Sequence, residues 1–463
     1  SALLFLRRPP KLGTKARRGR DLEVDLIATL VGKQRVTAPP ILLVPQTFVW
    51  SKQAGTATPS LLDLLFGPVQ WPGRVRVFFQ FLLNYRDAKL RSGEPFNLKE
   101  FLDKNPELSD SEAADKVRYA LLRRMERDRA VIIGPMKKTT ARIQDEILRS
   151  PRVRTQIERF AEERDIPYSR AEKVARKQLQ KLCAKQSLFV VDLMHRFLTW
   201  MWSKMYDGVV LDKEGLERVR EAARDASIVL LPSHKSHIDY LVLSDQLYAH
   251  AMMPPLIAAG ENLSFWPLGV LLRRGGAFFI RRSFHGDTLY PVIVEAYVRT
   301  LIAEGFTIEF FLEGGRSRTG KALPPKYGLL SMVFDSAVML PATKIIFVPI
   351  SIGYERIIEE RSFVHERSGG DKQSENVGDL IKSSSVLRSK WGRLYVQFGD
   401  IIDFDDYKKE AADKLGSCES MEAADPAQRR ASVRALAHKV MYSINEVTVV
   451  TPAALVATAL LSH

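Results

Sequence analysis

The feature that most constrains the fold is an alternation of short apolar runs with amphipathic segments, which begins near residue 206. The β-rich runs occupy residues 227–231, 277–280, 306–312, 345–352 and 394–398. Helical candidates lie between them at residues 238–249, 287–304 and 327–339. This alternation is typical of an α/β layer with a buried sheet, in which ligands bind beyond the strand ends. We therefore expect an α/β domain with a mixed, largely buried sheet over residues 206–410.

The part of the chain before this domain has a helical pattern. Two sequences of the form Ser-x-x-Glu, at Ser109/Glu112 and Ser169/Glu172, are typical of capping boxes that satisfy free N–H groups at a helix start. Apolar residues then recur at helical spacing after each box. We expect residues 1–205 to form a helical N-terminal domain.

A polar stretch at residues 415–426 precedes another helical candidate at 427–446. The sequence ends shortly afterwards within the apolar stretch TPAALVATALLSH. We therefore expect residues 411–463 to be the start of a longer, truncated C-terminal helical region.

Composition limits the classes of function. The chain has 69 Lys and Arg against 54 Asp and Glu, a formal net charge of +15, which suits a nucleic acid, an anionic bilayer or another acidic partner. Its two cysteines, Cys183 and Cys418, are far apart and favour neither a disulfide scaffold nor a zinc site. We find no secretory signal and no apolar run near the roughly 18 residues needed to span a bilayer.

The decapeptide LPSHKSHIDY follows the first apolar run and contains His234, His237 and Asp239. In a straight helix His234 and Asp239 would lie about 140° apart. They can meet if His234 occupies the turn after the strand and Asp239 the first turn of the next helix. The carboxylate could then orient the imidazole while its other nitrogen takes a proton from a substrate hydroxyl. A polar turn in which Asp239 caps a helix is the alternative that these residues alone leave open.

A second block, RRGGAFFIRRS, places Arg281 and Arg282 at the carboxyl end of an expected strand. Arginine presents a planar fork of donors that matches phosphate oxygens. The block indicates a phosphate clamp, and a solvated basic strand end is the alternative.

The third block, FFLEGGRSRTGK, runs from an expected strand into Glu313, Gly314, Arg316 and Arg318. Glycines let the backbone approach a ligand, and the cationic side chains and hydroxyls around them could surround an anion. The block is not a Walker P-loop, because Ala322 follows Gly-Lys where that motif requires Ser or Thr. A basic surface loop is the alternative, although a carboxylate beside arginines usually holds them or binds a hydroxyl.

The fourth block, IIFVPISIGYE, is an apolar run interrupted by Pro349. Proline cannot donate to a sheet ladder, so it marks an edge, a bulge or a place where backbone lines a cavity. This block is informative only together with the other three.

In this order, HKSHID, GAFFIRR, FLEGGRSRTG and IFVPIS resemble the four motifs of the glycerolipid acyltransferase superfamily. The longer GGRSRTGKALPPKYGLL is especially similar to the bacterial membrane glycerol-3-phosphate 1-O-acyltransferases, whereas lysophosphatidate acyltransferases usually carry a shorter EGTRS form. The segments VIIGPMKKTTARIQDEIL and MWSKMYDGV extend the similarity into the helical part.

The resemblance implies a role for each matching residue. His234 would be the general base and Asp239 its orienting partner. The residues implied in substrate binding are Arg281, Arg282, Glu313, Gly314, Arg316, Arg318 and Pro349, the last shaping the acyl-donor side. His237 matches a variable position and receives no role. No metal or cofactor is implied.

The implied reaction transfers a fatty acyl group from acyl-CoA or acyl carrier protein to the sn-1 hydroxyl of glycerol-3-phosphate. Dihydroxyacetone phosphate or a lysophospholipid as acceptor, and a non-enzymatic protein that binds nucleic acid or anionic membranes, are the alternatives. With the acyltransferase assignment we expect no nucleic-acid partner and a peripheral or monotopic location at the cytoplasmic face of the inner membrane. Residues 61–85 and 188–206 are basic, aromatic candidates for lipid contact, although a core helix is the favoured interpretation of the second.

Overall fold

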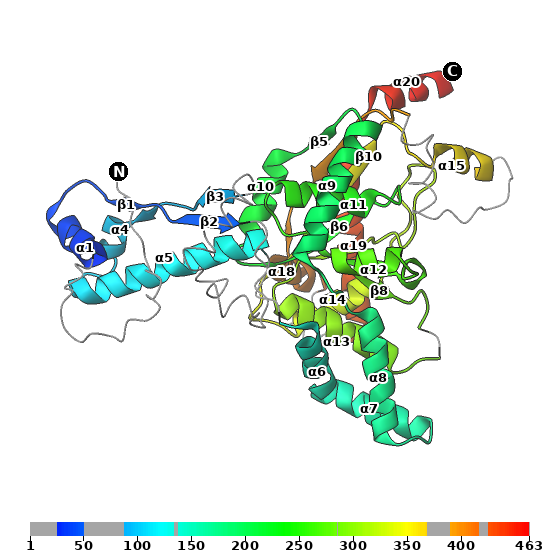
Figure 1. Cartoon of the computed structure of the whole chain (residues 1–463), viewed down its shortest axis with the longest axis horizontal. Coiled ribbons are helices and arrows are strands. Elements are labelled where there is room, and N and C mark those ends of the chain that lie inside the picture. The colour runs from blue at the N-terminus through cyan, green and yellow to red at the C-terminus, as the bar shows by residue number, and fades with distance from the viewer. Residues whose placement is uncertain are drawn as a thin grey trace. The chain divides into compact units, whose positions relative to one another are not determined.

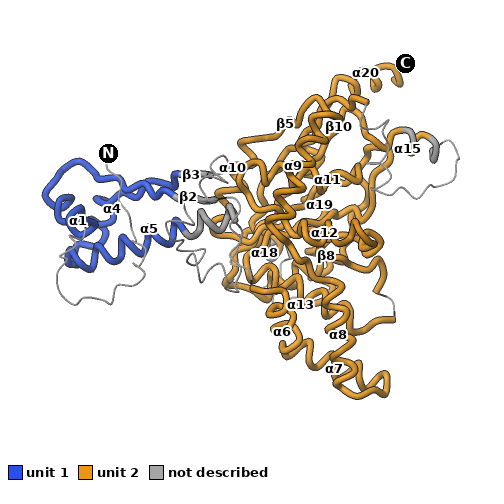
Figure 2. The backbone as a smooth tube through the Cα atoms, in the orientation of Figure 1, with its two compact units in different colours: residues 1–136 blue, residues 137–463 orange. Residues whose placement is uncertain are grey.

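The structure, a computed structural model, describes residues 26–50, 88–133, 138–284, 286–367, 389–415 and 425–462. The chain divides into two compact units, residues 1–136 and 137–463 (Figure 2). This division differs from the predicted boundary at residue 205. The physical reason is that helices between residues 138 and 205 pack against elements of the sheet domain and share its core.

The described residues of the first unit form three helices and two short antiparallel strand pairs, β1 with β4 and β2 with β3. Its elements are α1 (Leu26–Val36), β1 (Leu42–Leu43), β2 (Gln46–Trp50), β3 (Ala88–Ser92), β4 (Phe96–Asn97), α4 (Leu98–Asp103) and α5 (Asp110–Ile133). The predicted capping box at the start of α5 is confirmed, because Glu112 N donates to Ser109 Oγ at 3.3 Å and Ser109 N donates to the Glu112 carboxylate at 3.0 Å.

The second unit contains an eight-stranded mixed sheet, which confirms the α/β prediction (Figure 1). Its order is β5-β11-β10-β6-β9-β7-β8, with β12 paired to β10. Strands β10, β6, β9, β7 and β8 run parallel, whereas β11 and β12 are antiparallel to β10. The bounds are β5 (Val209–Leu211), β6 (Ser227–Pro232), β7 (Leu256–Gly260), β8 (Ala277–Ile280), β9 (Ile308–Glu309), β10 (Ile345–Tyr354), β11 (Leu394–Phe398) and β12 (Ile402–Asp403).

Helices cover the sheet, and the largest core lies on one of its faces. In β6, Val229 and Leu231 belong to this core, so the alternating Ile228 and Leu230 point to the opposite face. The helices that contribute to the core are α6 (Thr140–Arg149), α7 (Pro151–Glu163), α8 (Tyr168–Leu182), α13 (Tyr290–Ala303), α14 (Gly328–Val338), α18 (Phe404–Leu415) and α19 (Pro426–Glu446).

A second set of helices lies outside this core. Helix α9 (Leu188–Met205) contacts both α11 (Asp239–Ala249) and α12 (Leu268–Gly275). The remaining helical elements are α10 (Lys213–Ala222), η2 (Glu261–Leu263), α15 (Glu360–Arg367) and α20 (Pro452–Leu461). The space between the sheet and the α9, α11 and α12 group receives the residues that follow the parallel strands.

Two local predictions differ from the structure. The apolar run 306–312 forms only the two-residue strand β9, because the chain turns away directly after it. The second predicted capping box is wrong, since α8 begins at Tyr168 after Pro167 and has no side-chain cap at its start. A proline at the cap already fixes the backbone there, so Ser169 lies inside the first turn.

Pro349 lies inside β10, and its neighbours explain why a proline is tolerated. On one side it pairs with Leu231 of β6. On the other side the partner of β10 changes from β12, paired at Phe347, to β11, paired at Ile350. Gly399 N donates to Pro349 O at 2.9 Å in this transition. The proline therefore occupies an interruption in the ladder, where a missing N–H costs little.

Some predictions concern residues outside the described ranges. These are the possible lipid-contacting residues 61–85, Cys418 and most of the linker at 415–426. Within the described ranges, no helix combines the length and the apolar character that crossing a bilayer requires. In the same ranges, no group of three or more His, Cys, Asp or Glu side chains is placed to hold a metal ion.

Candidate active site

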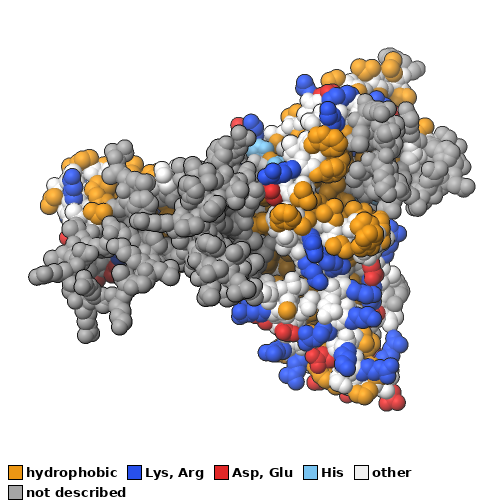
Figure 3. Space-filling view, viewed as in Figure 1, with side chains coloured by type: hydrophobic (Ala, Val, Ile, Leu, Met, Phe, Trp, Pro, Cys, Tyr) orange, Lys and Arg blue, Asp and Glu red, His pale blue; other side chains and the backbone are white. Residues whose placement is uncertain are grey.

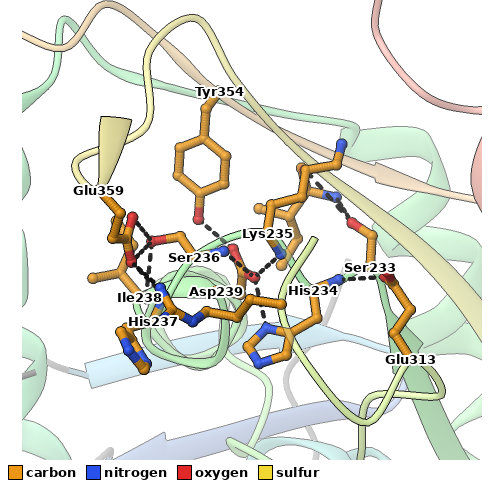
Figure 4. A network of polar contacts seen from close by, with 12 residues as sticks. Ser233, His234, Lys235, Ser236, His237, Ile238, Asp239, Glu313, Tyr354 and Glu359 are labelled. Atoms are coloured by element: carbon orange, nitrogen blue, oxygen red, sulfur yellow. Dashed lines mark hydrogen bonds and ion pairs between the residues drawn. The ribbon is translucent and has the colours of Figure 1, made fainter. Parts of the chain in front are cut away.

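The geometry of HKSHID is the one its spacing requires. His234 lies in the turn after β6, and Asp239 is the first residue of α11. His234 Nδ1 and Asp239 Oδ2 are 3.0 Å apart (Figure 4). The histidine follows the end of the strand and the aspartate begins the helix. The turn between these two elements therefore brings side chains five positions apart into contact.

Asp239 is fully buried, and its carboxylate is saturated with donors. Besides the imidazole, Oδ2 accepts hydrogen bonds from Lys235 N at 2.7 Å and Ser236 N at 2.8 Å, while Tyr354 donates its hydroxyl to Oδ1. The positive end of the α11 dipole also favours a carboxylate at this position. These contacts offset the cost of burying the group and hold it in one orientation.

His234 is fixed on every side except one. Its ring stacks on Phe311 with 3.9 Å between centroids. Its backbone N donates to Glu313 Oε1 at 2.8 Å, and its backbone O accepts from Ser317 N at 2.8 Å. Because Asp239 accepts from Nδ1, the proton of the neutral ring lies on Nδ1 and Nε2 is the acceptor. Nε2 bonds to no described residue, which leaves it available to a ligand.

His234 lines a cavity of about 1470 Å³ at the carboxyl ends of the parallel strands. Residues directly after β8 and β9 line it too, as do Gly260 at the end of β7 and residues of α9 and α11. Single small-molecule pockets measure roughly 300–1,000 Å³. The cavity can therefore hold a ligand larger than one small metabolite, or two ligands side by side.

Cationic side chains from the segments after β8 and β9 line this cavity, and together they are called its cationic wall. The lining residues that carry a positive charge are Arg281, Arg282, Arg316, Arg318 and Lys326. Four of them are the predicted arginines, which the fold brings together from the segments after β8 and β9. Lys326 was not singled out from the sequence, although it lies in the extended third block. Five positive charges around one wall favour an anionic ligand.

The arginines differ in the ion pairs and ring contacts that they make within the protein. Arg281 Nη1 is 2.7 Å from Asp287 Oδ2, and its guanidinium lies 4.2 Å from the centre of the Tyr290 ring. Arg316 pairs with Glu359 at 3.2 Å. Arg282 lines the cavity with no hydrogen bond or ion pair to a described residue. Arg282 is thus the arginine whose donors are most available for a ligand.

Gly314 is required by the backbone as well as lining the cavity. It has a φ of +62°, which favours glycine, and a Cβ there would come within 2.8 Å of Lys326 Cγ. The turn lets the chain after β9 pass close to His234 and then present its cationic residues.

Two predicted binding residues do not face the cavity. Glu313 is buried and binds backbone, accepting from His234 N and from Leu323 N, each at 2.8 Å. It therefore joins the first and third blocks rather than offering its carboxylate to a ligand. Pro349 is not among the lining residues, because it lies in the interior of the sheet.

Sequence reasoning missed two residues that complete the network in Figure 4. Tyr354, at the end of β10, donates to Asp239, and burial raises the pKa of its hydroxyl well above the ordinary value, so it stays a donor. Glu359 accepts from Ser236 Oγ and His237 N and pairs with Arg316. Burial raises the pKa of the Glu359 carboxyl. Tyr354 lies near the end of the fourth block and Glu359 follows it, and no spacing rule links either residue to the first block.

Comparisons with known proteins extend over most of the chain. Three family models match: the PlsB N-terminal domain of glycerol-3-phosphate acyltransferase at residues 1–134, an acyltransferase model at 210–353, and the glycerol-3-phosphate acyltransferase C-terminal region at 363–463. The acyltransferase match contains the four motifs HKSHID, GAFFIRR, FLEGGRSRTG and IFVPIS.

Curated relatives agree with these matches. The glycerol-3-phosphate acyltransferase of Ectopseudomonas mendocina is 33% identical over 98% of this chain and 54% of its own length. The protein of the same name from Shewanella putrefaciens is 34% identical over 98% of this chain and 56% of its own. The chain thus spans about half the length of the curated relatives it matches.

A solved structure, the LPA acyltransferase PlsC from Thermotoga maritima, aligns at 16% identity over 57% of this chain and 80% of that one. Its TM-score of 0.31 is too low to establish a common fold. The three family models and the relatives at one third identity do establish the family. The chain belongs to the PlsB-type glycerol-3-phosphate acyltransferases.

Proposed function

We propose that the protein transfers a fatty acyl group from a thioester to the sn-1 hydroxyl of glycerol-3-phosphate, producing lysophosphatidate. The observation that carries this proposal is a histidine oriented by a buried aspartate, with its free nitrogen in a cavity beside five cationic side chains. A phosphorylated alcohol needs both parts, a base for its hydroxyl and an anion site for its phosphate. The names of the curated relatives support the same reaction.

In the proposed mechanism, His234 Nε2 takes the proton of the acceptor hydroxyl while the hydroxyl oxygen attacks the thioester carbonyl carbon. The tetrahedral intermediate collapses with cleavage of the carbon–sulfur bond. The leaving thiolate takes the proton back from the imidazolium, so the base is regenerated. Asp239 stabilises the imidazolium, and assistance of this kind typically contributes about 10²–10⁴-fold. The histidine and aspartate provide the proton transfer, so the mechanism employs no metal or cofactor.

The phosphate would bind the cationic wall. Arg282, with no described partner, would supply the main fork of donors, and Arg316 and Arg318 would complete the site. Glu359 holds Arg316 from behind, so this arginine is already oriented before a ligand arrives. Positioning the acceptor by its phosphate brings the hydroxyl to His234 without a further contact.

The donor would be acyl-CoA or acyl carrier protein. Both carry acidic groups, which the net charge of +15 would attract. Apolar side chains also line the cavity, among them Val191, Leu198 and Leu241, and they would accept the acyl chain. A volume of about 1470 Å³ leaves room for both substrates at once.

We further propose that the protein works at an anionic membrane surface, at the cytoplasmic face of the inner membrane. One face of α9 is buried, as the core interpretation predicted, but the other is not. Large apolar side chains are exposed on α9 and at α12, namely Phe189, Leu193, Phe197, Trp200, Phe265, Trp266, Val270 and Leu271. Hydrophobic side chains, with Lys and Arg beside them, gather on the surface where these two helices lie (Figure 3). Such a surface suits a bilayer interface, and it adjoins the cavity that α9 lines.

Vesicle sedimentation tests the membrane proposal. Replacing Trp200 and Trp266 by Glu should reduce binding to vesicles that contain phosphatidylglycerol, while activity on detergent-dispersed substrate is retained. The Tyr119→Glu variant, altered at an exposed aromatic residue in the other unit, is the control. Equal vesicle binding by the wild type, the double tryptophan variant and the control would show that this surface does not bind the membrane.

Acyl-transfer assays test the function. The full chain is supplied with palmitoyl-CoA and, separately, with glycerol-3-phosphate, dihydroxyacetone phosphate or lysophosphatidate. We expect turnover with glycerol-3-phosphate and its loss in His234→Ala. Turnover with lysophosphatidate alone would replace the proposed acceptor. Salt-sensitive nucleic-acid binding without thioester turnover would instead indicate the non-enzymatic alternative.

A further inference from the structure

A second histidine–aspartate pair lines the same cavity. His195 on α9 and Asp245 on α11 are joined by a 2.6 Å contact between Nδ1 and Oδ1. Trp202 Nε1 donates to the other carboxylate oxygen of Asp245 at 3.1 Å. Asp245 is buried, while His195 and Asp245 are both lining residues. Neither residue belongs to the four sequence blocks, and the mechanism above makes no use of them.

The arrangement repeats that of His234 and Asp239. In both pairs the imidazole bonds through Nδ1 to a buried carboxylate of α11, and an aromatic side chain, Trp202 or Tyr354, donates to the second carboxylate oxygen. The consequence is also the same: Nε2 of His195 bonds to no described residue and is held in one orientation. A buried carboxylate that orients a ring through Nδ1 is typical of a ring whose other nitrogen contacts a ligand.

The surroundings of His195 differ from those of His234. None of the cavity-lining residues that α9 and α11 contribute is a lysine or arginine. The other lining residues of α9 are the apolar Val191, Met194 and Leu198, whereas α11 adds the hydroxyl-bearing Tyr240, Ser244 and Tyr248. His195 is therefore an oriented polar group among lining residues that carry no cation, contributed by helices other than the segments that carry the phosphate-binding cations.

The acyl donor has one part that needs such a group. An acyl chain has no hydrogen-bonding atoms beyond its carbonyl, and the acceptor's phosphate is satisfied by the cationic wall. The pantetheine arm carries amides, the first of them two methylene groups from the sulfur. Asp239 and Asp245 are six residues apart on α11, which separates them by about 9 Å along the helix axis. This axial spacing is of the order that an extended pantetheine arm, starting at the thioester beside His234, can span.

We propose that His195, oriented by Asp245 and Trp202, binds the pantetheine arm of the acyl donor through its free Nε2. The neutral ring accepts a hydrogen bond from an amide N–H of the arm. CoA and acyl carrier protein share this arm, so the contact serves both donors. The identity of the donor rests on the proposed function, but binding of the arm can be measured without acyl transfer.

Two substitutions separate ligand binding from a structural role. The amide of His195→Asn can replace Nδ1 and keep Asp245 bonded, but it lacks an equivalent of Nε2. The amide of His195→Gln reaches the position of Nε2 and leaves Asp245 without its partner. His250→Asn is the matched control, because His250 also bonds through Nδ1, to Gln246 O, but does not line the cavity.

Binding is measured with two inert thioethers, S-hexadecyl-CoA and S-hexadecyl-pantetheine, and KM with palmitoyl-CoA and palmitoyl-acyl carrier protein. We expect His195→Asn to weaken binding of both thioethers and raise both donor KM values about fivefold, the effect of one ordinary hydrogen bond. His195→Gln should stay closer to wild type, and kcat and the KM for glycerol-3-phosphate should change less than twofold. A thermal unfolding scan confirms that each variant is folded.

Each contrary result has a meaning. Wild-type binding in His195→Asn together with loss in His195→Gln would show that the histidine only satisfies Asp245. An effect confined to the CoA ligands would show that it contacts the nucleotide, and a fall in kcat without a change in donor KM would make it a second proton-transfer group. Wild-type protein that binds the thioethers but does not acylate glycerol-3-phosphate would overturn the proposed function and leave the pantetheine site standing.

Discussion

The two histidine–aspartate pairs of the cavity use one hydrogen-bonding pattern in two different settings. His234 belongs to a turn that Glu313, Ser317 and Phe311 hold from several sides, and it faces the cationic wall. His195 belongs to a regular helix, has an edge contact with the ring of Tyr248, and lies among lining residues of α9 and α11 that include no lysine or arginine. The comparison teaches that the pairing with aspartate fixes the ring but does not assign its role. The role follows from what the second ring nitrogen can meet.

The largest expected difference is in kcat, between variants that remove the aspartate charge from one pair or from the other. Asp239→Asn should lower kcat by about 10²–10⁴-fold, because the amide no longer stabilises the imidazolium or selects its tautomer. Asp245→Asn should leave kcat within about twofold and raise only the donor KM. Steady-state assays with each substrate varied in turn measure both effects. A comparable loss of kcat in the two variants would mean that the two pairs act together in the chemical step.

The next largest effect is on KM, and it distinguishes the cationic wall from the lining residues of α9 and α11. Arg282→Ala should raise the KM for glycerol-3-phosphate about 10–100-fold, which corresponds to one charge-assisted hydrogen bond, and leave the donor KM unchanged. Arg274→Ala is the control, since Arg274 lies on α12 and does not line the cavity. If the donor KM rises instead, the cationic wall binds CoA phosphates and the assignment of these two parts of the cavity must be reversed.

The aromatic donors behind the two carboxylates offer a finer comparison. Tyr354→Phe removes the hydroxyl that Asp239 accepts, and we expect kcat to fall about tenfold with a displaced acid limb in the pH–rate profile. The pKa of Tyr354 is raised by burial, so the hydroxyl donates throughout the accessible pH range and its loss should be felt at every pH. Trp202→Phe should change only the donor KM, by about threefold. An unchanged pH profile in Tyr354→Phe would show that this tyrosine is structural.

The smallest effect should come from Gly314. Gly314→Ala places a Cβ near Lys326 Cγ at a positive φ, which costs about 1–3 kcal/mol of stability. Because the strain lies on the cationic wall, the KM for glycerol-3-phosphate should rise a few-fold and the donor KM should not. Thermal unfolding and the two KM values report this. Gly286→Ala is the control, because it also has a positive φ but no neighbour within 4 Å of the added Cβ.

The sequence predicts much of the side of the cavity that contains His234 and the arginines, because these residues follow strands. Strands β8 and β11 have the predicted bounds, and the residues after β6, β8 and β9 meet at one sheet edge, as parallel strands require. Glu313 has the expected position at the end of a strand, but it accepts hydrogen bonds from backbone amides. These contacts depend on how two loops pack, which the amino-acid composition does not predict.

The other side of the cavity could not be predicted in this way. His195 and Trp202 lie on one helix and Asp245 on another, 50 and 43 residues away, so their meeting depends on how α9 packs on α11. Within α9 each looks like an ordinary residue of an amphipathic helix. Tyr354 and Glu359 were missed for a related reason, since they come from the end of β10 and the segment after it, and meet the first block only because β10 pairs with β6.

Helix α11 carries both aspartates, so the spacing of the two pairs is set by helix geometry. An insertion of one residue between Asp239 and Asp245 would turn the second carboxylate by about 100° and separate it from His195. The length of this segment is therefore constrained, while the chemistry at its far end can vary if positions 195 and 245 change together. In relatives that differ at one of these positions, we expect a compensating difference at the other and an unchanged number of residues between the two aspartate sites.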